Sequence, residues 1–294
     1  MTIPFVSRQI PSATRPSSRA LAISIVVNVE EGAEMSVENG DSGPEPVDEM
    51  GVTLHSSRRN FGNESNYRYG IVEGFPRVAR VLEEHATPAT WTCAAVALER
   101  APEIATFIRE RGDEAASHGD RWIHQFRMEE PEERAFLERA RDSIKKSVGT
   151  APVGHLSRYL TTEKTRSLLV KTGFRYSMDD YSGDEPFWDV TENGPIVVVP
   201  YAIDTNDMKM WANAAYTPSN WLEYAITSFD ELYAERRPGY RMMSLGVHLR
   251  IIGRPGRIGA LRRFLKHVQS HEDIWFVRRR EIAEAFAENV PEPR

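Results

Sequence analysis

The segment from Ala20 to Val29 places the strongest constraint on the fold of this chain. Apart from Ser24 and Asn28, every residue in it is Ala, Leu, Ile or Val, and most of these are β-branched. This composition predicts a strand that is buried on both faces, as in a parallel sheet covered by helices. The carboxylates Glu30 and Glu31 follow at once. Because the carboxyl ends of parallel strands carry the chemistry in α/β folds, these carboxylates are a candidate site. On this stretch alone a solvated acidic turn is the favoured reading.

The rest of the chain alternates between strand and helix patterns. Further strands are expected at 87–96, 114–117, 152–156, 174–178, 195–203, 241–249 and 274–277. Helices are expected at 75–85, 102–111, 130–148, 162–173, 218–236, 257–269 and 281–286. Residues 32–69 are expected to form a long irregular loop of functional importance. The alternation is typical of successive βα units and predicts an α/β fold with seven or eight strands, although it does not distinguish an open sheet from a closed barrel.

Length and composition exclude several classes of protein. The 294 residues suit one large α/β domain or two modest ones, and the net charge of −6 argues against nucleic acid or an anionic membrane as the partner. No apolar run is long enough to cross a membrane, and the single cysteine, Cys93, excludes an intrachain disulfide or a cysteine zinc cluster. Residues 1–19 lack a secretory pattern and are expected to form an arm before a catalytic domain at 20–294. A cytoplasmic location is expected.

Polar residues gather at the ends of the expected strands. They are Asn28, Glu30 and Glu31; His118, Arg121 and Trp122; Asp204 and Asn206; and His248. Each has a plain structural reading, such as a turn former, a core ring or a hydrogen-bonded histidine. Because all of them fall at one end of the sheet, the set as a whole predicts general acid–base hydrolysis.

Four segments resemble the polysaccharide deacetylase superfamily. They are VVNVEEGAE, ASHGDRWIH, PYAIDTNDM and SLGVHLRIIGRPGR, which occur in the family's order and extend the similarity over nearly all of the chain from Ala20. Within the superfamily they look most like the branch of allantoinases and cyclic imide hydrolases. The resemblance implies a distorted (β/α) barrel of about seven strands and hydrolysis of a non-peptide C–N bond. It also implies a homo-oligomer, either a tetramer or a dimer.

The resemblance also implies roles for single residues. In related metal-dependent members, the general base would fall on Asn28, a metal ligand on Glu30, two histidines on His118 and Trp122, and the general acid on His248. A second alignment places the two acidic residues on Glu30 and Glu31. Asn28 cannot accept a proton at neutral pH and Trp122 cannot bind a metal, whereas a catalytic zinc takes three protein ligands. No cofactor is therefore expected to be required, and a weakly held zinc on Glu30 and His118 is the alternative.

The expected reaction is the opening of a small cyclic amide, imide or ureide by water. Glu30 or Glu31 would be the base, with His248 as the acid. The other expected roles are oxyanion donors at His118 and Arg121, a stacking surface at Trp122, and polar substrate contacts at Asn28, Asp204 and Asn206. The alternatives are a metal-dependent polysaccharide N-deacetylase and an inactive binding module with the deacetylase fold. The sequence does not choose among cyclic substrates.

Overall fold

The strand β1 (Leu21–Val29) belongs to a mostly parallel sheet, in which it pairs with three other strands. The computed structural model describes residues 14–210, 216–235 and 238–293. Within these residues the strand order is β6-β7-β5-β4-β3-β2-β1-β8, and β9 also pairs with β1. The remaining strands are β2 (Ala89–Cys93), β3 (Glu114–Ser117), β4 (Gly154–His155), β5 (Tyr176–Ser177), β6 (Phe187–Thr191), β7 (Gly194–Val198), β8 (Met242–His248) and β9 (Ile274–Phe276).

The sheet has the shape of a barrel that is open on one side. All the strand pairings are parallel except that of β6 with β7. Within the described part of the chain, no pairing joins β7 to β8. The parallel strands therefore bring their carboxyl ends to one edge, and the expected distorted (β/α) barrel is confirmed.

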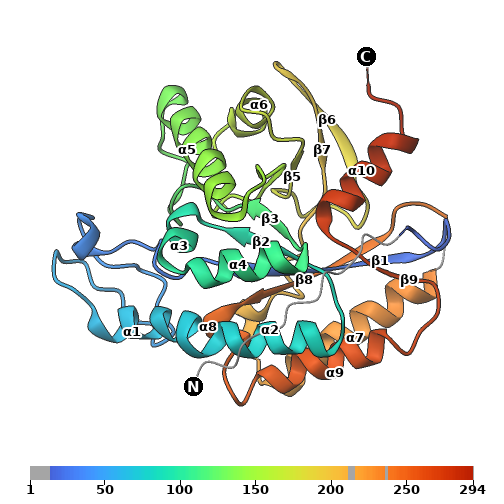
Figure 1. Ribbon diagram of the computed structural model, residues 1–294, viewed down its shortest axis with the longest axis horizontal. Helices are drawn as coiled ribbons and strands as arrows, with labels where there is room; N and C mark the ends of the chain where they lie inside the picture. The colour runs from blue at the N-terminus through green and yellow to red at the C-terminus, as the bar shows by residue number, and fades with distance from the viewer. Residues whose placement is uncertain (1–13, 211–215, 236–237, 294) are drawn as a thin grey trace.

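Helices follow most of the strands and cover the outside of the sheet. The α-helices are α1 (Phe61–Tyr69), α2 (Phe75–Glu84), α3 (Ala95–Arg100), α4 (Pro102–Arg111), α5 (Glu130–Val148), α6 (Thr165–Lys171), α7 (Pro218–Glu235), α8 (Leu249–Ile252), α9 (Ile258–Val268) and α10 (Arg279–Asn289). A π-turn, η2 (Gly70–Gly74), joins α1 to α2, and short 3₁₀ turns occur at η1 (Val37–Asn39) and η3 (Asp207–Met210). Figure 1 shows α2, α9 and α7 side by side along one side of the sheet.

The strand β1 is buried along its whole length, as predicted. Ile23, Ile25 and Val27 pack with the helices of the largest hydrophobic cluster. Ala22 and Val26 point to the other face and belong to a second cluster. This alternation explains the near-continuous apolar run, because both faces of β1 lie in a core.

Several elements differ from the sequence prediction, including β2, β6 and α1. The expected strand at 87–96 is shorter, because β2 ends at Cys93 and α3 begins at Ala95. The strand β6, which is half-exposed, was not predicted, although its residues FWDVT favour strands. Part of the expected loop at 32–69 is the helix α1, whose first turn is capped by the Asn60 side chain accepting from Asn63 N.

The ends of the described chain bear on two other expectations. Residues 1–13 of the expected arm lie outside the described residues, as does residue 236 at the end of the expected helix 218–236. Arg15, which is described, donates to Ala20 O and places its guanidinium over the Tyr240 ring. The division into an arm and one catalytic domain stays a prediction. No helix among the described residues has both the length and the apolar character needed to span a bilayer.

Candidate active site

Three predicted residues meet at the carboxyl edge of the sheet. Glu30 directly follows β1, His118 directly follows β3, and His248 is the last residue of β8. The Oε1 atom of Glu30 lies 3.4 Å from His118 Nε2 and 3.2 Å from His248 Nε2. All three side chains are buried. The parallel register of the central strands thus brings one carboxylate between two imidazoles.

Two cations hold Glu30 in its ionised form. Its Oε2 atom accepts a hydrogen bond of 2.7 Å from Nη1 of Arg250, which is fully buried. Burial alone would raise the pKa of the Glu30 carboxyl, but the charges of His248 and Arg250 outweigh it and hold that pKa well below its usual range. Glu30 is therefore a carboxylate at neutral pH.

His248 is held as an imidazolium by carboxylates on both sides. Its Nδ1 lies 2.6 Å from Asp207 Oδ1, and Asp207 Oδ2 accepts from the backbone N–H groups of His248 and Ile252. Burial would lower the pKa of His248, but Glu30 and Asp207 raise it to about 9. The Nε2 atom therefore carries a proton at neutral pH and can donate it, as a general acid does.

His118 differs from His248 because its Nε2 atom carries a lone pair in place of a proton. Its Nδ1 lies 2.6 Å from Leu156 O, and because a carbonyl can only accept, Nδ1 carries the proton. The Nε2 atom then accepts a hydrogen bond of 3.1 Å from the indole N–H of Trp122. Trp122 thus contacts the nitrogen that would otherwise face a metal.

The expected stacking role of Trp122 is wrong in this structure. The indole is buried, with the guanidinium of Arg158 3.7 Å above its ring and Tyr67 packed beside it. Since Arg158 covers the ring, a planar substrate has no open ring surface to stack on there. Trp122 instead contributes its N–H group.

Arg250 is a site residue that sequence reasoning missed. Its guanidinium packs against the rings of Tyr67 and Trp122, at 4.4 and 5.5 Å from their centroids. Its Nη1 binds Glu30, whereas its Nη2 is buried and has no hydrogen-bond partner among the described residues. An unpaired buried donor is costly, so this N–H group is available to a ligand atom beside Glu30.

Two other predicted residues, Glu31 and Asn28, form hydrogen bonds with the segments that carry the site. Glu31 accepts from the backbone N–H groups of Arg250 and Glu30, and burial raises the pKa of its carboxyl. Asn28 donates to Tyr201 Oη and to Val247 O, and its Oδ1 accepts from Thr92. These partners occupy the Asn28 amide, and its contact with a substrate stays a prediction.

Three other predicted residues point to different partners. Arg121 forms an ion pair with Asp41, at 2.5 Å, and donates to Glu34 O. Asp204 is exposed and accepts from Tyr224 Oη. Asn206 donates to Tyr201 Oη and accepts from the backbone of Met208. The structure therefore does not bring these side chains to Glu30, and within the segment 204–207 it is Asp207 that contacts His248.

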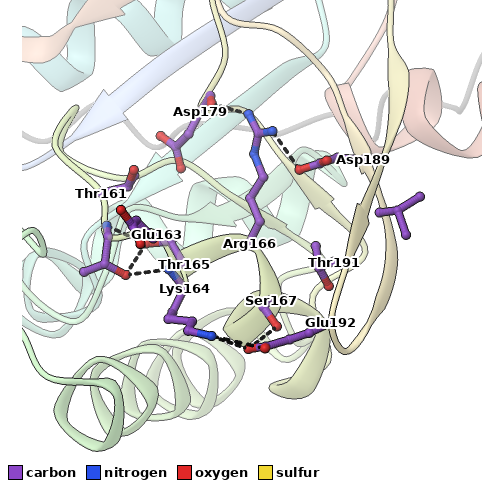
Figure 2. A pocket seen from close by; sticks show the side chains of 12 residues that line it. Thr161, Glu163, Lys164, Thr165, Arg166, Ser167, Asp179, Asp189, Thr191 and Glu192 are labelled. Carbon is purple, nitrogen blue, oxygen red and sulfur yellow. Dashed lines mark hydrogen bonds and ion pairs between the residues drawn. The ribbon is translucent and has the colours of Figure 1, made fainter.

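A cavity of about 460 Å³ lies near the same edge, at the start of α6. Figure 2 shows that Arg166 crosses it between Asp179 and Asp189. Asp179, which follows β5, is buried and accepts from the backbone N–H of Ser157, and burial raises the pKa of its carboxyl to about 6. Arg166 pairs with Asp189, Lys164 pairs with Glu192, and no histidine lines the cavity, so it offers no acid–base pair like that of Glu30 and His248.

A catalytic zinc, which the resemblance implies, does not fit the residues around Glu30. The Nε2 atom of His118 accepts from Trp122, the Nε2 atom of His248 is protonated, and Arg250 neutralises Glu30. A zinc ligand must instead present an unprotonated nitrogen or a free carboxylate. Whether turnover requires any cofactor stays a prediction.

Comparisons with known proteins point to one family. Residues 66–177 match the family model described as "Polysaccharide deacetylase". A protein of Schizosaccharomyces pombe named "Putative polysaccharide deacetylase" is 31% identical, and the alignment covers 94% of this chain and 93% of the relative. The "Peptidoglycan deacetylase" of Helicobacter pylori is 24% identical over 74% of this chain and 85% of the relative.

Two solved structures resemble the whole fold. A "probable Polysaccharide deacetylase" from Pseudomonas aeruginosa PAO1 has a TM-score of 0.88 and 36% identity, and the match covers 94% of each chain. PuuE allantoinase has a TM-score of 0.90 and 33% identity, with 99% of this chain and 100% of the other covered. The chain is therefore similar in structure to a polysaccharide deacetylase and to an allantoinase, the two groups that its sequence motifs resemble.

Proposed function

The chain belongs to the polysaccharide deacetylase family, and from that premise we propose that it opens a small cyclic amide, imide or ureide without a metal at this edge of the sheet. The fold and the relatives support a hydrolase of C–N bonds. The observation that carries the narrower proposal is the hydrogen bond from Trp122 Nε1 to His118 Nε2, which replaces a metal contact with a fixed donor. The likeness to PuuE allantoinase over nearly the full length also supports it.

Water attack begins at Glu30. The carboxylate takes one proton from a water molecule as the water oxygen bonds to the ring carbonyl carbon. The carbonyl oxygen becomes an oxyanion, for which the unpaired Nη2–H of Arg250 is a buried, positively charged donor. This step forms a C–O bond and leaves the C–N bond intact.

His248 completes the reaction by giving its Nε2 proton to the ring nitrogen as the C–N bond breaks. The products are a carboxylic acid and an N–H group, so one water molecule has been added. Once His248 is neutral, the charge that lowered the pKa of Glu30 is gone, and Glu30 holds its proton more tightly. The 3.2 Å contact between Glu30 and His248 lets that proton return to Nε2, which restores both groups.

A deacetylase is the second candidate, because the names of several relatives favour it. The same acid–base pair would act on an acyclic acetamide, with the amine leaving instead of a ring nitrogen. The two candidates therefore differ in substrate and share their proton transfers. The proposed homo-oligomer, a dimer or a tetramer, is separately measurable by sedimentation.

The test measures the opening of the allantoin and succinimide rings through the loss of their ultraviolet absorbance. A parallel assay measures the release of acetate from N-acetylglucosamine oligomers. Wild-type protein should open one of the rings, and Glu30→Gln should lower kcat by about 10²-fold or more, since general-base contributions are of that size. The matched control is Glu192→Gln, an exposed carboxylate paired with Lys164, which should keep the wild-type rate.

Other results would reject the proposal. Acetate release without ring opening would establish the second candidate. Absence of turnover on every substrate would favour the inactive binding module. Equal rates for Glu30→Gln and wild type would remove Glu30 from the mechanism.

A further inference from the structure

A second cluster of metal-binding side chains lies where α7 packs against α9. Asp230 is on α7, His267 is in the last turn of α9, and His271 follows that helix. One ligand atom from each residue lies within 4.8 Å of the other two. Over residues 14–210, 216–235 and 238–293, this is the only group of three or more His, Cys, Asp or Glu residues with such spacing. It shares no residue with the candidate active site.

The local hydrogen bonds leave one ring nitrogen of His271 open to a ligand. Its Nδ1 lies 2.9 Å from His267 O, and because the carbonyl accepts, Nδ1 carries the proton. The lone pair is then on Nε2. A histidine that donates one ring N–H to a backbone carbonyl and binds a metal through the other nitrogen is the usual arrangement in metal sites.

Asp230 and His267 already face each other. His267 Nε2 lies 2.7 Å from Asp230 Oδ1, a contact that shares one proton. Two tetrahedral zinc ligands lie about 3.3 Å apart, given bonds of about 2.0–2.1 Å. Asp230 must therefore move slightly away from His267 and toward His271, and its side chain, which is 47% exposed, has room to rotate.

Aromatic packing limits the freedom of both imidazoles. The buried Phe229 ring packs edge-on against His267 and His271, with centroids 5.6 and 4.9 Å apart. Tyr233 packs against His271 in the same way, at 4.9 Å. Because these rings are already restrained, ligation costs less side-chain entropy than it would on an open surface.

We infer that Asp230, His267 and His271 form a binding site for a divalent transition metal such as zinc, which fastens α7 to α9. Two imidazoles and one carboxylate suit zinc and its neighbours, whereas magnesium and calcium prefer sets of oxygen ligands. Three protein ligands leave one position for water. This inference stands independently of the proposed reaction.

The test is a calorimetric titration of the tag-free full chain with zinc chloride. Wild-type protein should bind one zinc ion per chain, and its Tm should rise with zinc because a ligand of the folded state stabilises it. His267→Ala and His271→Ala should each weaken binding at least about tenfold, since even indirect disturbance of a metal ligand costs that much. His55→Ala removes an exposed histidine from another part of the chain and should bind zinc as wild type does.

A second variant guards against loss of fold. Asp230→Asn keeps the side-chain shape and the helix α7, and it should weaken zinc binding while the circular dichroism spectrum is unchanged. The inference is wrong if wild-type protein binds no zinc, or if His267→Ala and His271→Ala bind it unchanged. It is also wrong if His118→Ala, and not His267→Ala, abolishes binding, because the zinc would then be at the strand ends.

Discussion

Glu30 has neighbours that set the protonation states of the whole site. One oxygen faces His118 and His248, and the other accepts from Arg250. This arrangement leaves an ionised carboxylate beside a protonated imidazole, the pairing of base and acid that hydrolysis of an amide needs. The residue-scale predictions follow from these contacts.

The pH dependence of turnover should follow His248. Its pKa is raised to about 9, so the general acid is protonated below that pH and the rate should fall as pH rises through it. Asp207→Asn removes one of the two carboxylates that raise this pKa, and the alkaline limb of kcat should move toward neutral pH. A pH–rate profile of each protein measures this shift of the alkaline limb. Asp204→Asn, an exposed change in the same segment, should leave the limb in place, and an unmoved limb in Asp207→Asn would contradict the assignment.

The free energy of unfolding should also fall as pH rises. The folded-state pKa of His248 is raised above its unfolded value of about 6.5, so its contribution is fully present below that pH. It is lost as pH rises through about 9. Denaturant melts of wild type between those limits should show a falling free energy of unfolding, with a smaller slope in Asp207→Asn.

Arg250 should act on the transition state more than on substrate binding. Arg250→Lys keeps a positive charge near Glu30 but removes the second N–H arm, the unpaired Nη2. Loss of one oxyanion donor costs about 10²–10³-fold in kcat, so kcat should fall by that order with little change in KM. A rise in KM at unchanged kcat would show instead that Arg250 only binds the substrate.

At the scale of elements, the turn η2 places the helices α1 and α2 against the site. A Cβ atom on Gly70 would overlap the Glu31 carboxylate, and one on Gly74 would overlap Leu249 O. These glycines let the backbone of η2 lie directly against the end of β1 and the start of α8, which carries Arg250. This close packing thus fixes the positions of Glu31, which follows β1, and of Arg250 on α8.

Gly74→Ala should therefore disturb both the fold and the site. Overpacking of this kind costs about 1–3 kcal/mol of unfolding free energy. A Tm several degrees lower, together with reduced kcat, is the expected result in thermal melts and ring-opening assays. Gly256→Ala, where a new Cβ meets nothing within 4 Å, should stay within about 0.5 kcal/mol of wild type. Equal stability of the two variants would mean that η2 can shift freely.

Elements with clear local signals were predictable. The helices α4 and α5 have the predicted bounds, because Gly112 and Gly149 end them in left-handed conformations. The buried run of β1 was equally clear. The strand β6 was missed although a local signal exists, because FWDVT is rich in strand-favouring residues and Asn193-Gly194 is a typical hairpin turn before β7.

The candidate site was predictable only in part, for a physical reason. Glu30, His118 and His248 come together because strand ends share an edge, which a strand pattern can indicate. Asp207 and Arg250 lie within the quoted segments PYAIDTNDM and SLGVHLRIIGRPGR, but position in a segment does not show which polar side chain turns toward Glu30 and His248. Arg121 and Asp204 were chosen because they follow expected strands, but they pair with Asp41 and Tyr224 instead.

At the scale of the whole molecule, acid–base chemistry and metal binding are assigned to different surfaces. The strand-end site offers no vacant ligand set, whereas the α7–α9 surface groups two imidazoles and a carboxylate. Exhaustive chelation should therefore lower Tm and remove bound zinc while leaving the rate of ring opening unchanged. Parallel melts, metal analysis and assays of one sample measure this, and loss of turnover on chelation would contradict the division.

The indole of Trp122 also has a consequence for inhibitor selectivity. Hydroxamates and similar chelating groups gain affinity by capturing a catalytic ion, but here the nitrogen of His118 that would hold such an ion accepts from an indole N–H. Compounds of that type should therefore bind this protein far more weakly than they bind an enzyme with a catalytic metal ion. A neutral tetrahedral mimic that accepts from Arg250 and from protonated His248 is the better starting point for inhibitor design.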